Sequence, residues 1–168
     1  MSILSVIKYP HPLLRKKSKQ VSNINAKISK LIDDMIETMY SFPGCVGISA
    51  PQIGKSLRVI IFDVSKHKKA HLSNHKLTVV VNPVIIEKKG KIMNREGCLS
   101  LPDFTGNVTR AERIKIKGKD KHSKRIEFYL VGFEAVAFQH EIDHLDGILF
   151  IDRISSLKTD IFRRKRYL

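Results

Sequence analysis

The 168-residue chain contains no tryptophan, and only 7% of its residues are aromatic. None of its apolar runs approaches the roughly 20 residues of a membrane span, which excludes a conventional transmembrane helix, and we expect no membrane partner. The first residues contain neither an apolar stretch of signal-peptide length nor a small-residue cleavage site. We therefore expect a cytoplasmic protein.

Cysteine is scarce, with Cys45 and Cys98 far apart in the sequence. This number excludes a small scaffold held together by several disulfides. One disulfide stays open as an alternative. Two cysteines in a chain without a leader are, however, more often free thiols or metal ligands.

Acidic residues are few: 16 stand against 31 lysines and arginines, for a net charge of +15. Such a charge attracts nucleic acid, ribosomes or anionic surfaces, although a generally lysine-rich solvated surface is the simpler explanation. The densest basic run is FRRKRYL at 162–168, which we regard as the best local candidate for contact with ribosomal RNA. No feature indicates specific DNA binding.

The length and composition predict one domain, 1–168, without repeats or a linker. Apolar residues recur at helical spacing over 26–41, so we predict an amphipathic helix there. Asn23 or Asn25 would cap its start, and Pro43-Gly44 would end it.

Short runs rich in β-branched residues predict strands at 57–64, 77–82, 84–89, 113–118 and 125–132. A second helix is predicted over about 133–146, with Gly147 as a left-handed cap after its end. A helix, then several strands, then a helix is typical of an α+β fold rather than of alternating βαβ units.

The most informative motif, HEIDH, lies within this second helix. His140 and His144 are four residues apart and therefore share one helix face, where two imidazoles can hold one metal ion. Glu141 lies about 100° round the helix axis and can act as a base toward a bound water. This pattern predicts a metal-dependent hydrolase.

A catalytic metal usually has three protein ligands plus water, so one ligand is missing from this motif. No histidine follows His144, and neither Asp152 nor Asp160 falls in a recognised ligand spacing. Cys98, in EGCLSLP, is a candidate thiolate in an irregular turn, but it also fits a small buried core residue. His67, at the start of a series of three histidines spaced by four, is a poor candidate because the surrounding lysines would repel a cation.

A further unusual segment is GCVGISAPQIG at 44–54. Its glycines allow close approach of a ligand to the backbone, and the side chain of Gln52 could donate an amide N–H. The segment alone also fits an ordinary turn.

In this order along the chain, GCVGISAPQ, EGCLS and QHEIDH resemble the motifs of the peptide deformylase family. The resemblance extends to 6–21 and 148–154 and so covers essentially the whole chain. Cys45 stands where the family usually has its first glycine, and Ile48-Ser49 replaces Leu-Ala. Near the pocket, Cys45 would be a liability to oxidation or metal damage. After residue 154 the chain is short compared with members that have a long final helix.

The resemblance implies antiparallel β-sheets around a central HExxH helix. It also implies removal of the N-formyl group from the formyl-methionine of nascent peptides, with release of formate. Cys98, His140 and His144 would bind the metal, and a metal-bound water would be the nucleophile. Glu141 would be the general acid and base.

Two groups would stabilise the oxyanion in this scheme, the Gln52 amide and the backbone N–H of Leu99. The backbone at Val46 and Gly47 would pair with the substrate as an added strand. We expect the remaining substrate contacts from residues beside these positions or on the histidine face of the helix: Ile48, Gly97, Phe133, Val136 and Ala137.

The ligand types alone favour zinc, whereas the resemblance implies Fe(II), with Zn(II), Ni(II) or Co(II) as replacements. Two other functions stay open. An HExxH metallopeptidase would need a third ligand downstream. A basic RNA-binding protein with an inactive metal site would not need Glu141 or Gln52.

Overall fold

The computed structural model describes residues 2–164. One antiparallel sheet has the strand order β1-β2-β3-β6-β7, and a second has the order β4-β5-β8. The first sheet contains β1 (Gly47–Ser49), β2 (Val59–Phe62), β3 (Thr78–Lys89), β6 (Arg113–Lys119) and β7 (Arg125–Val131). The second contains β4 (Ile92–Cys98), β5 (Leu101–Arg110) and β8 (Ile161–Arg163). The helices are α1 (Ala26–Ser41), α2 (Phe133–Leu145) and the 3₁₀ turns η1 (Pro12–Arg15), η2 (Ala50–Ile53) and η3 (Phe150–Arg153).

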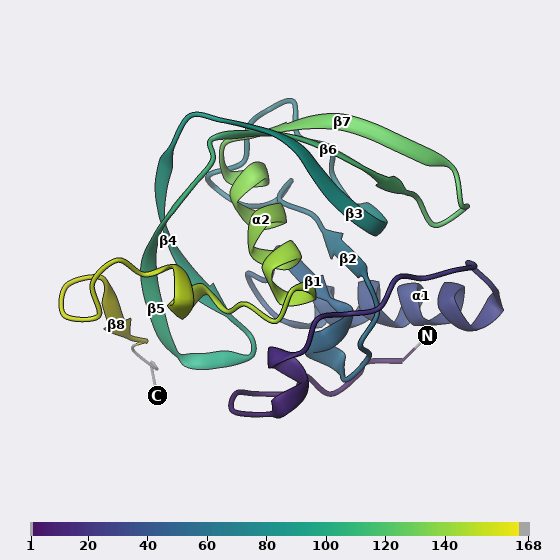
Figure 1. The fold of residues 1–168 in the computed structure, drawn as a ribbon, viewed down its shortest axis with the longest axis horizontal. Helices are drawn as coiled ribbons and strands as arrows, with labels where there is room; N and C mark the ends of the chain where they lie inside the picture. The colour runs from purple at the N-terminus through teal and green to yellow at the C-terminus, as the bar shows by residue number, and fades with distance from the viewer. Residues whose placement is uncertain (1, 165–168) are drawn as a thin grey trace.

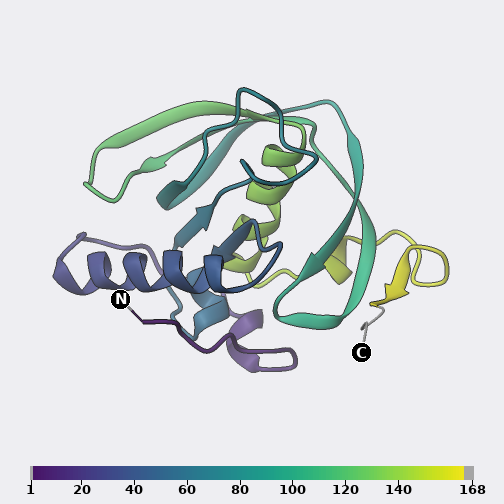
Figure 2. The same ribbon diagram turned by 180° about the vertical axis from the view of Figure 1, so that it is seen from behind.

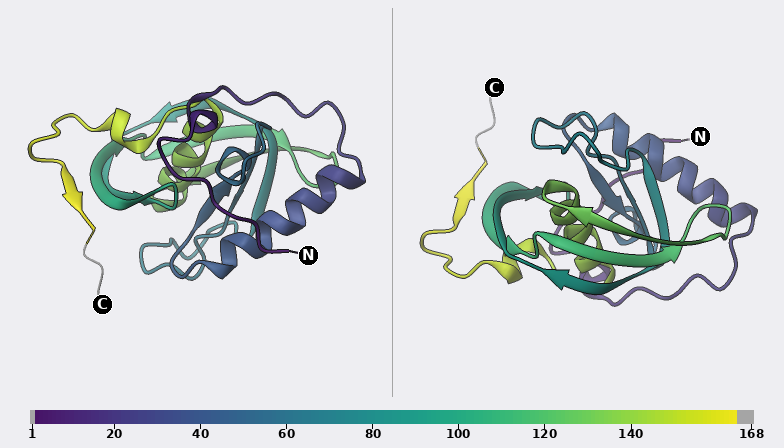
Figure 3. Two further views of the ribbon diagram at one scale, coloured as in Figure 1. Left: turned by 90° about the horizontal axis from the view of Figure 1, so that it is seen from below. Right: turned by 90° about the horizontal axis from the view of Figure 1, so that it is seen from above.

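Helix α2 stands in the middle of the molecule, with β4 and β5 on one side of it and the longer sheet around the rest (Figure 1). Helix α1 lies on the outside, near β1 and β2 (Figures 2 and 3). This arrangement confirms the predicted α+β class with antiparallel sheets. Neither helix in the described residues is long and apolar enough to cross a membrane.

Strand β2 separates two hydrophobic cores. Val59 and Ile61 belong to the cluster under α1, whereas Ile60 and Phe62 belong to the cluster under α2. All four side chains are fully buried because successive residues of a strand point to opposite faces and a helix covers each face. A strand buried on both faces explains the continuous apolar run of the sequence, and each such side chain contributes about 1.5–3 kcal/mol of burial.

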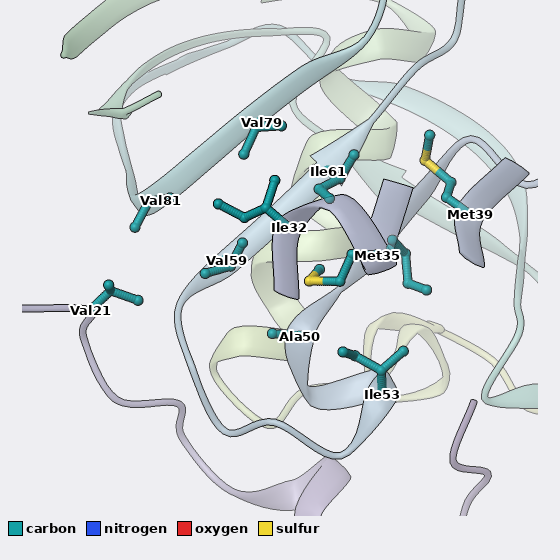
Figure 4. Packing of buried hydrophobic residues seen from close by; sticks show 11 residues of the cluster. Val21, Ile32, Met35, Met39, Ala50, Ile53, Val59, Ile61, Val79 and Val81 are labelled. Atoms are coloured by element: carbon teal, nitrogen blue, oxygen red, sulfur yellow. The ribbon is translucent and has the colours of Figure 1, made fainter. Parts of the chain in front are cut away.

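Helix α1 has the predicted bounds. The Asn25 side chain accepts hydrogen bonds from the backbone N–H groups of Lys27 and Ile28, both at 3.1 Å, so Asn25 rather than Asn23 is the cap. The helix buries an apolar stripe that includes Ile32 and Met35 against the longer sheet, as the close view in Figure 4 shows.

Helix α2 is also confirmed, and it ends one residue before the predicted bound. Gly147 follows it with φ +72°, as expected for a left-handed cap. A Cβ on Gly147 would lie only 2.5 Å from the carbonyl oxygen of Arg15, so the position requires glycine for space as well as for conformation.

The prediction of two strands at 77–82 and 84–89 was wrong, because β3 is continuous. The Asn82-Pro83 pair that suggested a break is absorbed as a register shift between Val81 and Val84. The Asn82 side chain meanwhile bonds the backbone N–H and carbonyl of Val21, each at 2.8 Å. The sequence analysis also missed β1, β4, β5 and β8, whose polar and glycine-containing sequences depend on pairing with a neighbour.

Candidate metal centre and active-site cleft

Three potential metal ligands meet at the centre of the molecule. Cys98, His140 and His144 each offer a ligand atom, and the three atoms lie within 4.8 Å of one another. The Cys98 sulfur is 3.3 Å from Nε2 of His144. This is the one cluster of three or more His, Cys, Asp or Glu ligands found in residues 2–164. The EGCLSLP segment alone left Cys98 open between ligand and core residue, whereas the family resemblance implied a ligand, and the structure brings Cys98 to the two histidines.

The end of strand β4 positions Cys98. The β4–β5 pairing runs in register to Gly97, then shifts so that Cys98 pairs with Leu101 across a tight return. Cys98 is therefore the last residue of a strand, not part of a free turn as the sequence suggested. The irregular pairing directs its side chain toward α2, where it is buried.

The electrostatics of the cluster suit a cation. Burial alone would raise the pKa of the Cys98 thiol, but the nearby His144 and a hydrogen bond with His140 lower it well below its ordinary value. A thiolate with two imidazoles is a donor set for a divalent transition metal. In addition, Oε2 of Glu141 is buried and has no hydrogen-bond partner among the described residues. The residues present therefore fit a bound metal ion.

A buried ionic network supports His140 from behind. Nδ1 of His140 is 2.8 Å from Oε2 of Glu96, which leaves Nε2 available as the ligand atom. Glu96 also accepts a hydrogen bond from Arg110 at 2.9 Å, and Arg110 donates to Asp143 at 2.9 Å. Asp143 accepts in turn from Arg153 at 2.8 Å.

This network keeps Glu96 ionised. Burial by itself would raise its pKa, but hydrogen bonds from His140 and Arg110 lower that pKa to about 2. Sequence reasoning did not assign a role to Glu96. The available signal was its place directly before Gly97-Cys98, since residues beside a ligand often orient another ligand.

Glu141 faces the cleft from the same helix. A Cβ on Gly47 would lie 2.7 Å from its Oε1, so only glycine at this point of β1 leaves room for the carboxyl group. Burial raises the pKa of Glu141 above its ordinary value. A raised pKa brings a carboxyl group closer to the pH at which it can both accept and donate a proton, which suits a general acid and base.

The Gln52 side chain is locked in one orientation. Its Oε1 accepts hydrogen bonds from the backbone N–H and the hydroxyl of Ser49, each at 3.0 Å. Its Nε2 consequently points toward the ligand cluster, 3.5 Å from the sulfur of Cys98 and 3.4 Å from the hydroxyl of Ser100. This amide can donate to an oxygen atom at the centre.

A cavity of about 420 Å³ opens beside these groups. Among the residues that line it are several predicted from the sequence, namely Val46, Gly47, Gln52, Gly97, Cys98, Leu99, Phe133, Val136, Ala137, His140 and Glu141. Ile48 does not line it, and its expected place in the pocket was wrong. Because side chains alternate along β1, Ile48 points into the core under α1 and is fully buried there.

Cys45 also lines the cavity, and both cysteines are free. Its thiol donates to the carbonyl of Gly47 at 3.1 Å. Burial, and then the nearby Glu141, raise the pKa of Cys45 to about 12. The thiol is thus protonated at neutral pH, which lowers its reactivity relative to a thiolate.

The series of histidines in the loop before β3 does not form a metal site. His67 lines the cavity and stacks on Phe133, with ring centroids 4.2 Å apart. His75 bonds Glu134 through Nδ1 at 3.0 Å, and His71 contacts a serine hydroxyl. The downstream carboxylates do not complete the centre either, since Asp152 pairs with Arg15 and Asp160 with Asn107.

Four exposed cationic side chains also line the cavity, namely Lys68, Lys69, Arg95 and Arg164, and the sequence did not predict any of them at the site. Arg164 belongs to the basic run 162–168, of which 165–168 lie outside the described residues. No local pattern could have placed these side chains together, because they come from three separate segments.

Comparison with known proteins identifies the family of this chain. The family model of polypeptide deformylase matches residues 3–160. The peptide deformylase of Thermodesulfovibrio yellowstonii is 49% identical over 98% of this chain and 97% of its own length, and that of Syntrophobacter fumaroxidans is 44% identical over 98% and 94%.

Solved structures give the same result. The crystal structure of peptide deformylase from Thermotoga maritima is 38% identical, with a TM-score of 0.84 over 93% of this chain and all of that one. The Ehrlichia chaffeensis peptide deformylase in complex with actinonin has a TM-score of 0.87 at 31% identity, over 94% of this chain and 92% of that one. The chain belongs to the polypeptide deformylase family, whose members are metal-dependent hydrolases that act in protein synthesis.

Proposed function

We propose that the chain hydrolyses the formyl amide of N-formyl-methionyl peptides and releases formate. The observation that carries the proposal is one cleft that combines a thiolate and two imidazoles with a buried carboxyl group and an oriented amide donor. Family membership supports the reaction, and the residue roles proposed below are those that the family resemblance implies, supported by the geometry of the cleft.

Cys98, His140 and His144 would hold one divalent cation, for which we propose Fe(II), with Zn(II), Ni(II) or Co(II) as replacements. When bound, the cation supplies Lewis acidity and lowers the pKa of a water molecule at the site. Glu96 fixes the orientation of His140, and the negative charge of Cys98 makes the centre less positive than three neutral imidazoles would.

Glu141 is the proposed proton carrier. Its carboxyl group lies between the ligand cluster and Gly47, and burial raises its pKa. It would accept the proton of the attacking water and deliver it to the amine that leaves when the formyl C–N bond breaks. The second product is then formate.

The oxyanion would be stabilised by two N–H donors, the Gln52 amide and the backbone of Leu99. Ser49 holds the Gln52 amide in place before substrate arrives, so little reorganisation is needed during the reaction. Removal of one preorganised donor of this kind costs about 10²–10³ in kcat.

Two sheet edges open onto the cleft and suit an extended peptide. β1 is the terminal strand of the longer sheet, and β4 is the terminal strand of the shorter one. Gly47 of β1 and Gly97 of β4 both line the cavity, so a peptide can lie beside either edge. The substrate methionine would then enter the apolar part of the cavity lined by Phe133, Val136 and Ala137.

Substrates of this type arise at the ribosome, so the proposal assigns the enzyme to the cytoplasm. The net charge of +15 favours approach to ribosomal RNA. An electrostatic contact of this kind would weaken steeply as the salt concentration rises.

Formate release from formyl-Met-Ala-Ser tests the proposed reaction. The protein would be prepared anaerobically with Fe(II) or loaded with Ni(II), with acetyl-Met-Ala-Ser and metal-free protein as controls. We expect formate only from the formyl peptide and only with metal. Cleavage of casein without formate release would instead identify a peptidase, and salt-dependent RNA binding without hydrolysis would identify an RNA-binding protein.

A further inference from the structure

The mouth of the cleft is positively charged. Lys68 and Lys69 come from the loop after β2, Arg95 from β4, and Arg164 from the residue after β8. All four residues are exposed and line the same cavity. We call these four residues the basic rim.

The acidic residues of the cleft do not neutralise the basic rim. Two carboxyl groups line the cavity, Glu96 and Glu141, and both residues are about 95% buried. Glu96 is engaged by His140 and Arg110, and Glu141 lies beside Gly47 at the centre. Their charges therefore act inside the cleft, while its mouth presents cations.

Neutral partners hold two of the rim cations in place. The guanidinium of Arg95 lies 3.8 Å from the centroid of the Phe162 ring and donates to the Thr105 hydroxyl at 3.0 Å. Nζ of Lys69 donates to Asn94 at 2.5 Å and lies 5.8 Å from the centroid of the Phe133 ring. Such contacts position a cation without cancelling its charge.

Arg164 lies against the backbone of β4. Its backbone N–H donates to the carbonyl of Asp103 at 2.8 Å, which fixes the chain at this point. A Cβ on Gly97 would lie 2.0 Å from its Nη2 atom, so the guanidinium rests directly on the backbone of β4 beside Cys98. This guanidinium is therefore close to the end of β4 that holds Cys98, within the cavity that a substrate peptide would enter.

The spacing of the rim sets which substrate residues it can meet. Arg95 is three residues before Cys98 on β4, which corresponds to about 10 Å at about 3.3 Å per residue. At the same rise per residue, an extended peptide whose formyl group lies at the metal centre would reach the level of Arg95 within the first residues after its methionine.

We propose that the basic rim makes the enzyme prefer formyl-methionyl peptides with an aspartate or glutamate within the three residues after the methionine. This specificity rests on the proposed deformylase function. A peptide carboxylate is favoured over an RNA phosphate as the ligand because all four cations line the cavity of the candidate metal centre and Arg164 rests on β4 beside Cys98.

The test compares kcat/KM for peptides that differ only in charge. Aspartate, asparagine and lysine are placed in turn at each of the three positions after formyl-methionine, and formate release is measured at low and high salt. Exposed ion pairs contribute about 0.2–1 kcal/mol each, so we expect aspartate to exceed asparagine by about fivefold at the preferred position. The difference would appear mainly in KM and would shrink in about 0.5 M salt.

The variant Arg164→Gln should lose about half of the preference for aspartate over asparagine. Adding Lys68→Gln and Lys69→Gln to that variant should remove most of the remaining preference. Arg125→Gln, an equal change of charge at the far end of β7, is the matched control and should leave the preference intact. Binding of the product peptides Met-Asp-Ala-Ser and Met-Asn-Ala-Ser to metal-free protein, measured by calorimetry, gives a readout independent of turnover.

Equal kcat/KM for aspartate and asparagine peptides at all three positions would overturn the specificity and leave the deformylase function standing. If the aspartate and asparagine peptides were equal and Arg164→Gln also lost binding to RNA, the basic rim would be an RNA-binding surface instead. Formate release from none of the peptides would overturn the proposed function and this inference together.

Discussion

The two α-helices of this molecule are buried in different ways. Five of the 16 residues of α1 are buried, and they form one stripe under an exposed face. Ten of the 13 residues of α2 are buried, and five of these are polar or ionisable. Burial of a polar side chain is unfavourable unless it has a partner, so α2 is stable only because its surroundings supply partners. The outer helix supports the fold, and the central helix carries the residues of the proposed chemistry.

The partners of α2 come from distant parts of the chain. Gln139 exchanges hydrogen bonds with the backbone of Ala111, at 3.1 and 2.8 Å, and Asp143 is held by Arg110 and Arg153. The buried apolar residues of α1, such as Met35, need only apolar contacts, which many side chains could provide. Substitutions should therefore affect activity on one helix and only stability on the other.

The largest effect is expected for Glu141→Gln. The substitution retains size but removes the proton carrier, so kcat should fall by about 10²–10⁴ while the thermal unfolding temperature changes little. Formate release and calorimetry of the metal-loaded variant give the two values. Turnover near that of the original protein with metal bound would exclude Glu141 as the acid and base.

Next is Arg110→Met, which leaves Glu96 and Asp143 buried without their shared cation. Removal of one partner from a buried ion pair costs about 3–5 kcal/mol, measurable by urea unfolding. The matched control is Arg153→Met, because that side chain is 45% exposed and its pair should contribute less than about 1 kcal/mol. Equal losses from the two variants would show that burial does not determine the strength of this network.

On α1, Met35→Ala should reduce the free energy of unfolding by about 2–5 kcal/mol, since the side chain is fully buried. The kcat/KM of the remaining folded protein should be unchanged, in contrast with Glu141→Gln. A decrease in kcat/KM well below the unfolding transition would contradict the separation between the two helices.

A smaller effect is expected for Asn25→Ala, which removes the cap of α1 and should cost about 1 kcal/mol. Asn23→Ala is the control, because its side chain does not cap the helix and its replacement should be nearly neutral. Chemical unfolding of the two variants measures the difference. A larger loss for Asn23→Ala would reassign the cap.

The smallest effect concerns Asp34 of α1. A hydrogen bond from Lys30 lowers its pKa, with a further one from the backbone N–H of Ser2. Because the folded pKa lies below the unfolded value of about 3.9, the stabilisation by the ionised carboxylate is present above that value and is lost as the pH falls through the folded pKa. Asp34→Asn should thus destabilise the protein at pH 7, and urea unfolding should show the difference in stability between the two proteins shrinking as the pH falls below the unfolded value. A constant difference would mean that packing, not charge, is responsible.

The sequence predicted those features that local patterns determine. Periodicity gave both helices, the i,i+4 spacing brought His140 and His144 together, and β-branched runs gave β2, β6 and β7. The motif resemblance supplied the expected role of Cys98, whose position at the metal centre depends on the register shift at the end of β4.

What the sequence did not predict depends on tertiary pairing. Strand β5 contains Pro102 and Gly106 and has little intrinsic strand preference, so it forms because β4 pairs with it. Ile48 was misplaced because a three-residue strand gives too little alternation to tell its two faces apart. Arg164 and Lys68 are nearly a hundred residues apart, and only the folded chain brings them to one cavity.

The two open sheet edges of the cleft have a consequence for solubility. An unpaired strand edge is a template on which another chain can add, and it can promote self-association. Here β1 is only three residues long and fully buried, and the cations at the mouth would repel a second copy of this strongly basic chain. The charges proposed to select an acidic peptide would therefore also keep the enzyme from pairing with itself.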